Sequence, residues 1–140
     1  MNIQQLKQLN QLLVEFYDKL SSWEHSVVKE TGYSLAQIHT IEVLGCHGAM
    51  RMKELAEKLG ITTGTLTVQV EKLVKAKLLT RSTQDDDRRA IVVDLTETGL
   101  ALHKHHNELH LALVKELTRN IEPKNAAILI ESMTLINREF

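Results

Sequence analysis

The histidines are the residues of this chain whose type and spacing could do metal chemistry. The sequence of 140 residues contains seven of them, and four lie within one short stretch: His103, His105, His106 and His110. On a helix, residues four apart project from the same face, so His106 and His110 could bind one metal ion. A histidine with an ordinary pKa of about 6.5 is largely neutral at pH 7 and able to coordinate. The alternative is packing against protein, because the stripe continues with Leu113, Val114 and Leu117.

The sequence contains none of the common catalytic motifs that we looked for. There is no His-Glu-x-x-His pair, no Gly-rich phosphate loop and no nucleophile elbow. Glu108 lies between His106 and His110, but on a helix it points away from the face that they share. We therefore expect no enzyme activity. A small zinc hydrolase and a purely structural dimer are the alternatives from other functional classes.

The single cysteine, Cys46, cannot form a disulfide within the chain. We expect it to be a small buried residue beside a surface imidazole, His47, rather than half of a ligand pair.

No apolar run reaches the ~18 residues of a membrane span, and the N-terminal residues lack the basic-then-apolar order of a signal peptide. The expected location is the cytoplasm, with no membrane partner.

The charges of the chain almost cancel. There are 17 Lys and Arg residues against 18 Asp and Glu, a net charge of −1 at pH 7. This balance alone does not indicate a nucleic-acid partner, so any such claim depends on how the charge is distributed. Residues 51–89 contain the basic side chains Arg51, Lys53, Lys58, Lys72, Lys75, Lys77, Arg81, Arg88 and Arg89. A nearly neutral protein can therefore present a basic face.

Apolar residues at steps of three and four predict long helices in the N-terminal third of the chain. The first thirty residues form one amphipathic helix that ends near Gly32, a plausible C-cap. Ser34 is a plausible N-cap for a second helix, which stops around Gly48. With one proline and six glycines in the whole chain, little else interrupts helical structure.

Two shorter helices follow, separated by a turn at Gly60. The first covers about Met52–Leu59, and the second is capped by Thr62 or Thr63. The apolar stripe of the second is Leu66, Val70, Leu73 and Val74. Two short helices around such a turn are typical of a helix-turn-helix.

After Lys77 the spacing of apolar residues changes from the period of a helix to that of a strand. Residues 78–83 and 90–95 predict two strands, joined as a hairpin by the polar residues 84–89. A fifth helix runs from Thr96 to about Asn120, and a sixth begins at Pro123.

The predicted fold is mainly α with a small two-stranded β wing, in a single domain over residues 1–140. Residues 34–96 form a winged helix-turn-helix, and residues 1–33 and 97–140 form long flanking helices. These outer helices carry more apolar surface than a lone winged domain needs, which indicates dimerisation through them.

Several short motifs fall in the order and at the spacing of one known family. They are residues 52–61 (MKELAEKLGI), 65–67 (TLT), 73–74 (LV), 87–89 (DRR) and 95–99 (LTETG). With these motifs the chain resembles the MarR family of bacterial regulators over nearly its whole length. The resemblance implies a homodimeric winged helix-turn-helix protein that binds pseudo-palindromic operator DNA, usually as a repressor of transcription.

The second helix of a helix-turn-helix lies in the major groove, with its N-terminal residues at the base edges. The side chains expected to face DNA from this helix are Thr62, Thr63, Thr65, Val68, Gln69 and Lys72. Threonine hydroxyls can donate to or accept from bases, whereas Lys72 more plausibly faces a phosphate. The family often has a basic residue at the place of Val68, so an arginine–guanine contact is not expected there.

The wing offers a second contact with DNA. Arg88 and Arg89 lie at or near its tip, where one arginine could enter a minor groove. Asp87 is expected to orient an arginine, because a carboxylate that faced phosphates would be repelled. The alternative is a solvated hairpin tip with a local ion pair worth less than ~1 kcal/mol.

A narrower resemblance concerns zinc. In the zinc-uptake repressors of the MarR family, the ligand positions fall in this sequence on His106, His110, His39 and, across a short gap, Glu24. His25 is the alternative to Glu24. This resemblance implies a tetrahedral zinc site and zinc as corepressor. A second metal site of those repressors does not carry over, since Ile38 and His105 stand where it needs carboxylates.

The rival hypothesis within the same family is release from DNA by a small organic ligand. Many relatives bind aromatic carboxylates between the dimer helices and the winged domain. The aromatic residues that could line such a pocket are Phe16, Tyr17, Trp23 and Tyr33. Their spacing also fits ordinary core packing.

Overall fold

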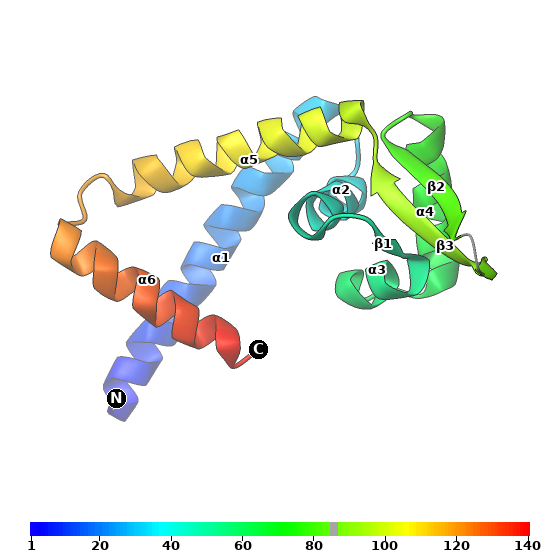
Figure 1. The fold of residues 1–140 in the computed structure, drawn as a ribbon. Coiled ribbons are helices and arrows are strands. Elements are labelled where there is room, and N and C mark those ends of the chain that lie inside the picture. Colours follow the sequence, from blue (N-terminus) through cyan, green and yellow to red (C-terminus); the bar gives the residue numbers. More distant parts are fainter. Residues whose placement is uncertain (85–86) are drawn as a thin grey trace. The chain divides into compact units, whose positions relative to one another are not determined.

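The structure is a computed structural model that describes residues 1–84 and 87–140, without the side chains of residues 84, 87 and 88. Its elements in chain order (Figure 1) are α1 (Ile3–Thr31), α2 (Leu35–His47), β1 (Met50–Arg51), α3 (Met52–Leu59), α4 (Thr63–Lys75), β2 (Leu79–Gln84), β3 (Asp87–Leu95), α5 (Glu97–Thr118) and α6 (Pro123–Arg138). The chain divides into two compact units, Met1–His103 and Lys104–Phe140. Helix α5 begins in the first unit and ends in the second.

The ends of α1 and α2 lie where local capping signals predict them. The side chain of Ser34 accepts a hydrogen bond from the backbone N–H of Gln37, and the Gln37 side chain accepts one from the N–H of Ser34. Such reciprocal bonds satisfy two N–H groups that a helix start leaves open. Gly32 ends α1 with a φ of 76°, a left-handed conformation that favours glycine.

The turn between α3 and α4 confirms the predicted helix-turn-helix. Gly60 ends α3 with a φ of 65°, and its N–H donates to the carbonyl of Glu57. Of the two candidate caps of α4, Thr62 takes the role: its hydroxyl accepts the N–H of Thr65 at 3.2 Å. Thr63 is the first residue of the helix.

The core of the first unit lies where α2, α3 and α4 meet the sheet. The predicted inward stripe of α4 is fully buried at Leu66, Val70 and Leu73. It belongs to one apolar cluster with Ile41, Leu44, Met50, Leu55, Ala56, Leu78, Leu79 and Val93. Burial of each large aliphatic side chain stabilises the fold by about 1.5–3 kcal/mol, so this cluster holds the helix-turn-helix to the wing.

The sheet contains one strand more than the predicted two-stranded wing. Its order is β1-β3-β2, and both pairings are antiparallel. Strand β1 has two residues, Met50 and Arg51, paired with Val93 and Val92. The prediction missed it because two residues are too few to show an alternating pattern.

Strand β3 is longer than predicted, since it begins at Asp87, whereas β2 has the predicted length and is shifted by one residue, ending at Gln84. Polar residues marked this segment as loop in the sequence. A polar side chain does not prevent backbone pairing, so the strand continues through residues 87–89. Figure 1 shows the hairpin beside α4.

The start of α5 depends on a close backbone contact. The Thr96 hydroxyl accepts the N–H of Gly99 at 3.1 Å and donates to the carbonyl of Lys77 at 2.7 Å. A β-carbon on Gly99 would lie 2.1 Å from the carbonyl oxygen of Leu78. A glycine is therefore needed where α5 leaves the sheet.

Many large apolar side chains remain exposed on the outer helices. On α1 they include Leu6, Leu13, Phe16 and Tyr17. In the second unit they include Leu111, Val114, Leu117, Ile128, Ile130 and Met133. Within the described part of the chain, none of the helices is both long enough and apolar enough to cross a membrane.

Candidate DNA-binding face and histidine pair

The predicted base-reading residues of α4 lie on its solvent side, opposite the buried stripe. Val68 is 53% exposed, and four others are also exposed: Thr62, Thr63, Thr65 and Lys72. Only Gln69 is half-buried. The first turns of α4 thus present hydroxyl and methyl groups to solvent, the groups that can contact base edges in a major groove.

The hydroxyl of Thr62 is engaged in the helix itself. It accepts the N–H of Thr65 and donates to the Thr65 hydroxyl oxygen at 3.0 Å. The proton of the Thr65 hydroxyl is therefore left to donate outward. Of these two threonines, Thr65 has the chemistry to read a base, and Thr62 has the chemistry to hold the helix start.

A buried residue that the sequence did not single out contacts Gln69. The hydroxyl of Thr40, on α2, is fully buried, 2.9 Å from the carbonyl of Ala36 and 3.4 Å from Oε1 of Gln69. The amide oxygen of Gln69 thus faces α2, which leaves its NH2 group as the donor toward other partners. Thr40 lies on the core face of a helix whose residues are otherwise mostly apolar, and only the tertiary structure pairs it with α4.

The wing supplies one described arginine. Arg89, on β3, is exposed and lines a groove that Thr63 of α4 also lines. The structure thus brings together two of the predicted DNA contacts from separate elements. The side chain of Arg88 lies outside the described residues, as do those of Asp85, Asp86 and Asp87.

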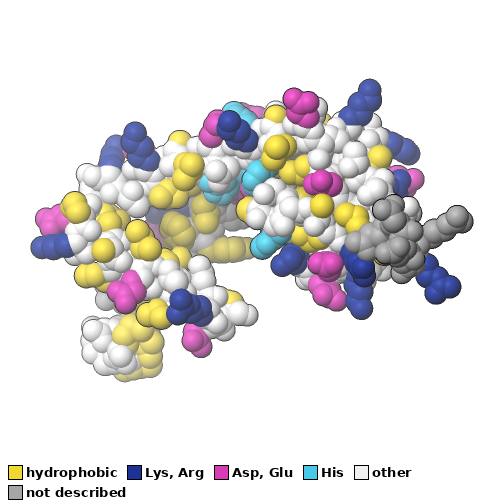
Figure 2. All heavy atoms as spheres, in the orientation of Figure 1, with side chains coloured by type: hydrophobic (Ala, Val, Ile, Leu, Met, Phe, Trp, Pro, Cys, Tyr) yellow, Lys and Arg dark blue, Asp and Glu magenta, His cyan; other side chains and the backbone are white. Residues whose placement is uncertain are grey.

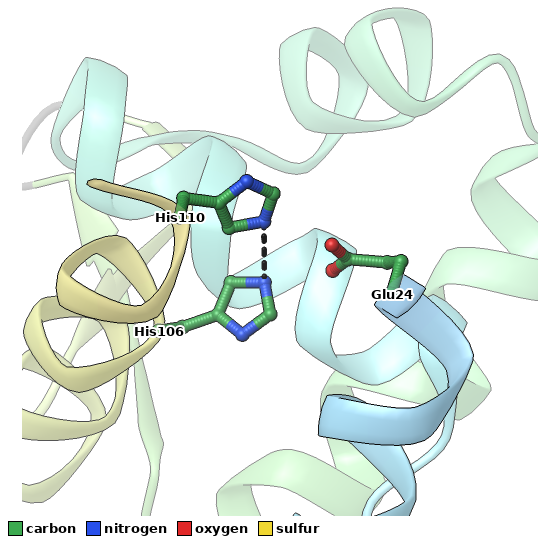
Figure 3. Close-up of side chains that lie close together, drawn as sticks. All are labelled: Glu24, His106 and His110. Atoms are coloured by element: carbon green, nitrogen blue, oxygen red, sulfur yellow. Dashed lines mark hydrogen bonds between the residues drawn. The ribbon is translucent and has the colours of Figure 1, made fainter. Parts of the chain in front are cut away.

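The two histidines predicted as a ligand pair face one another in the second unit. The Nε2 atoms of His106 and His110 are 3.2 Å apart, and the rings meet edge to face at 65° (Figure 3). His106 is 2% exposed and His110 is half-buried. Two nitrogens bound to one tetrahedral zinc ion at 2.0–2.1 Å are about 3.4 Å apart. The pair fits a zinc ion as well as it fits a shared proton.

The other two candidate ligands belong to the first unit. Glu24 is half-buried on α1, and His39 is exposed on α2. His25, the alternative to Glu24, is exposed, and its Nδ1 lies 2.7 Å from the carbonyl oxygen of Ser21. That contact occupies Nδ1 of His25 and leaves Nε2 able to coordinate, so Glu24 and His25 both stay candidates.

His103 takes a role that the sequence left open. Its Nδ1 lies 3.1 Å from Oε1 of Glu42 on α2, and both side chains are largely buried. It therefore joins α2 to the start of α5 instead of extending the ligand stripe. His105, also left open, is exposed.

The expectation that Cys46 is buried is wrong, because the structure exposes this thiol. Ile41 and Leu44 define the core face of α2, and a residue two positions after Leu44 points away from that face. His47 is exposed, as expected.

The chain is similar to known regulators in sequence. Residues 33–91 match the model of the MarR family. The chain is 27% identical over 106 residues to the uncharacterized HTH-type transcriptional regulator YfiV of Bacillus subtilis, covering 75% of this chain and 66% of that protein. It is 28% identical over 72 residues to the HTH-type transcriptional repressor MdtR of Bacillus subtilis, covering 51% and 46%. The matched stretches thus span about half to two thirds of these relatives.

Solved structures share the fold over almost the whole chain. A MarR family protein from Bacillus stearothermophilus superposes with a TM-score of 0.89 at 16% identity, over 99% of this chain and 97% of that one. FabT of Streptococcus pneumoniae, crystallised in complex with DNA, gives a TM-score of 0.85 at 21% identity, over 95% of each chain. The predicted fold class, a mainly helical winged helix-turn-helix with long flanking helices, is confirmed.

Proposed function

We propose, from the premise that this chain carries the winged helix-turn-helix of the MarR family over residues 33–91, that it represses transcription as a homodimer on pseudo-palindromic operator DNA. The observation that carries this proposal is the arrangement of α4. Leu66, Val70 and Leu73 of its apolar stripe are fully buried, while its N-terminal hydroxyl groups face solvent beside a basic wing. That is the arrangement needed for a helix that enters a major groove.

The roles of the residues follow from their chemistry. Thr63, Thr65 and Val68 lie at base edges, where Val68 selects a thymine methyl group rather than guanine. Lys72, one turn further along α4, contacts a phosphate and fixes the depth of the helix. Arg89 reaches the adjacent minor groove from the wing.

The exposed apolar side chains of the outer helices support a homodimer. A soluble monomer rarely leaves a large contiguous apolar surface in water. Dimerisation with a second copy of the chain is the simplest way to bury this surface. A two-fold dimer also presents two copies of α4 to two half-sites about 34–36 Å apart, which matches a pseudo-palindrome. The flanking helices would then position both recognition helices.

We further propose that zinc is the corepressor. His106 and His110 are the first two ligands, and their 3.2 Å separation supports this assignment. Glu24 and His39 complete the set, as the resemblance to zinc-uptake repressors implies. Zinc supplies no catalysis here: bound to α1, α2 and α5, it would stabilise the one arrangement of these helices in which the recognition helices match the operator.

Fluorescence anisotropy of the metal-free protein on DNA from upstream of its own gene tests both proposals. We expect zinc to strengthen binding, a chelator to reverse the effect, and His110→Ala to abolish the zinc response. The matched control is His105→Ala, since His105 is exposed on the same helix and is not assigned as a ligand.

Each other outcome removes one part of the proposal. Equal binding with and without zinc would exclude the corepressor and direct the search to an organic effector. Absence of binding to any sequence in a random-sequence selection would exclude the DNA-binding function itself and favour a structural dimer.

A further inference from the structure

The core of the first unit contains one polar side chain that faces α4. Thr40, on α2, is fully buried, and among the first-unit residues that the structure describes no other polar side chain is buried to this degree. Its hydroxyl group is bonded to the carbonyl of Ala36, but a carbonyl inside a helix already accepts the backbone N–H four residues later. An isosteric valine would fill the same space without a hydroxyl group to satisfy. The hydroxyl group therefore indicates a role beyond packing.

The second partner of this hydroxyl group is Gln69 on α4. Oγ1 of Thr40 lies 3.4 Å from Oε1 of Gln69 and 2.9 Å from the carbonyl oxygen of Ala36. One proton can serve both acceptors in a three-centre hydrogen bond. Because Ile41 of α2 and Leu66 of α4 belong to the same apolar cluster, the two helices are packed together where this contact forms.

Gln69 lies at the edge of the buried face of α4. Its neighbours on one side, Leu66 and Leu73, are fully buried, whereas its neighbours on the other side, Thr65 and Lys72, are exposed. The Gln69 side chain itself is half-buried. An amide group that points one end into an apolar core needs a polar partner there, and the hydroxyl group on α2 supplies it. The other end of the amide is left beside the side chains proposed to contact DNA.

We propose that Thr40 is a positioning residue for base recognition, which holds the Gln69 amide so that only its NH2 group faces the major groove. A free glutamine contacts adenine with both ends of its amide, donating to N7 and accepting from N6. A glutamine whose oxygen is held inward can only donate, and guanine presents two acceptors, O6 and N7. The inference rests on the proposed DNA-binding function, and it assigns to Gln69 a preference for guanine over adenine.

The direction of this amide matters because charge alone does not distinguish one sequence from another. Figure 2 shows Lys and Arg side chains projecting around the end of the first unit that contains α4 and the wing. Where such cations contact phosphates, they strengthen binding to every sequence alike. Discrimination depends on the side chains at the base edges, where the direction of a donor decides which base is accepted.

Selection of binding sites from a random-sequence library, followed by sequencing, tests the inference on the full chain. Comparison of the wild type with Gln69→Ala identifies the operator position that depends on Gln69, and there the wild type should prefer guanine. Thr40→Val removes the hydroxyl group and keeps the shape of the side chain. It should shift the ratio of adenine to guanine at least about fivefold toward adenine, the smallest factor expected for a paired contact. In the Gln69→Ala background, Thr40→Val should leave base preference unchanged.

Thr40→Ser is the matched control, because it keeps the hydroxyl group and removes the methyl group. We expect this variant to retain the wild-type base preference, although the loss of a buried methyl group lowers its free energy of unfolding. Urea unfolding of both variants measures stability beside base preference. A purely structural role of Thr40 would make the two quantities change together, whereas a positioning role separates them.

Several results would overturn the inference. A wild-type preference for a base other than guanine at this position would contradict the inward orientation of the amide oxygen. An unchanged ratio in Thr40→Val, or an equal shift in Thr40→Ser, would show that the hydroxyl group does not hold the amide. If Gln69→Ala changed no base preference, Gln69 would not read DNA, with the proposed function intact. If the wild type selected no sequence, the proposed function would fail together with this inference.

Discussion

The imidazole ring of His103 occupies the space that a β-carbon on Gly45 would take. A β-carbon built there would lie 2.3 Å from the ring, which itself contacts Glu42 on the same helix as Gly45. Glycine at position 45 therefore allows α5 to begin against α2. The absence of a side chain at position 45 thus allows α2 and the start of α5, which are distant in sequence, to pack together.

Gly45→Ala should lower the free energy of unfolding by about 1–3 kcal/mol, because the added methyl group displaces the His103 ring from a packed position. Urea unfolding followed by circular dichroism measures the change. Gly64→Ala is the matched control, since Gly64 is also helical and its β-carbon would meet nothing closer than 4.0 Å. That variant should be neutral or stabilised by up to about 1 kcal/mol. Equal losses in both variants would contradict the role of His103.

Thr62→Ala should cost about 0.5–2 kcal/mol of stability, because the backbone N–H of Thr65 loses its side-chain acceptor. Thr63→Ala should cost less, since Thr63 lies inside the helix. Thermal unfolding of both variants measures the difference. A larger loss for Thr63→Ala would move the N-cap of α4 by one residue.

Gly99→Ala should be among the most damaging small substitutions in the chain. Its β-carbon would lie 2.1 Å from a backbone oxygen of Leu78, which cannot move without disturbing the start of β2. We expect a loss of about 3 kcal/mol or more, measured by urea unfolding. Thr98→Ala, in the same turn at an exposed position, is the control and should change stability by less than about 0.5 kcal/mol. A Gly99→Ala protein as stable as the wild type would show that α5 can leave the sheet in another way.

His106→Ala and His110→Ala should each weaken zinc binding at least tenfold in competition with a chromophoric chelator. Loss of a residue that merely supports a zinc ligand already costs about 10–100-fold in affinity, and loss of a ligand should cost no less. His105→Ala should bind zinc as the wild type does. Binding that is unchanged in all three variants would place the zinc, if it is bound at all, away from the paired imidazoles.

The sequence by itself determined the helices and their ends. Helical periodicity and caps such as Ser34 and Thr62 act between residues three or four apart, so they can be recognised without the rest of the fold. The buried face of α4 followed from the same local pattern. The sequence also predicted that the rings of His106 and His110 lie together, because residues four apart on one helix project from the same face.

Only the tertiary structure decided the features that depend on distant segments. The pairing of Met50 with Val93, the contact of Thr40 with Gln69 and the packing of His103 over Gly45 each join residues more than twenty-five positions apart. The groove that Thr63 and Arg89 both line likewise forms only where a strand and the start of a helix converge. Local preferences act over a few residues, whereas such contacts exist only after the whole core has packed, so no local pattern records them.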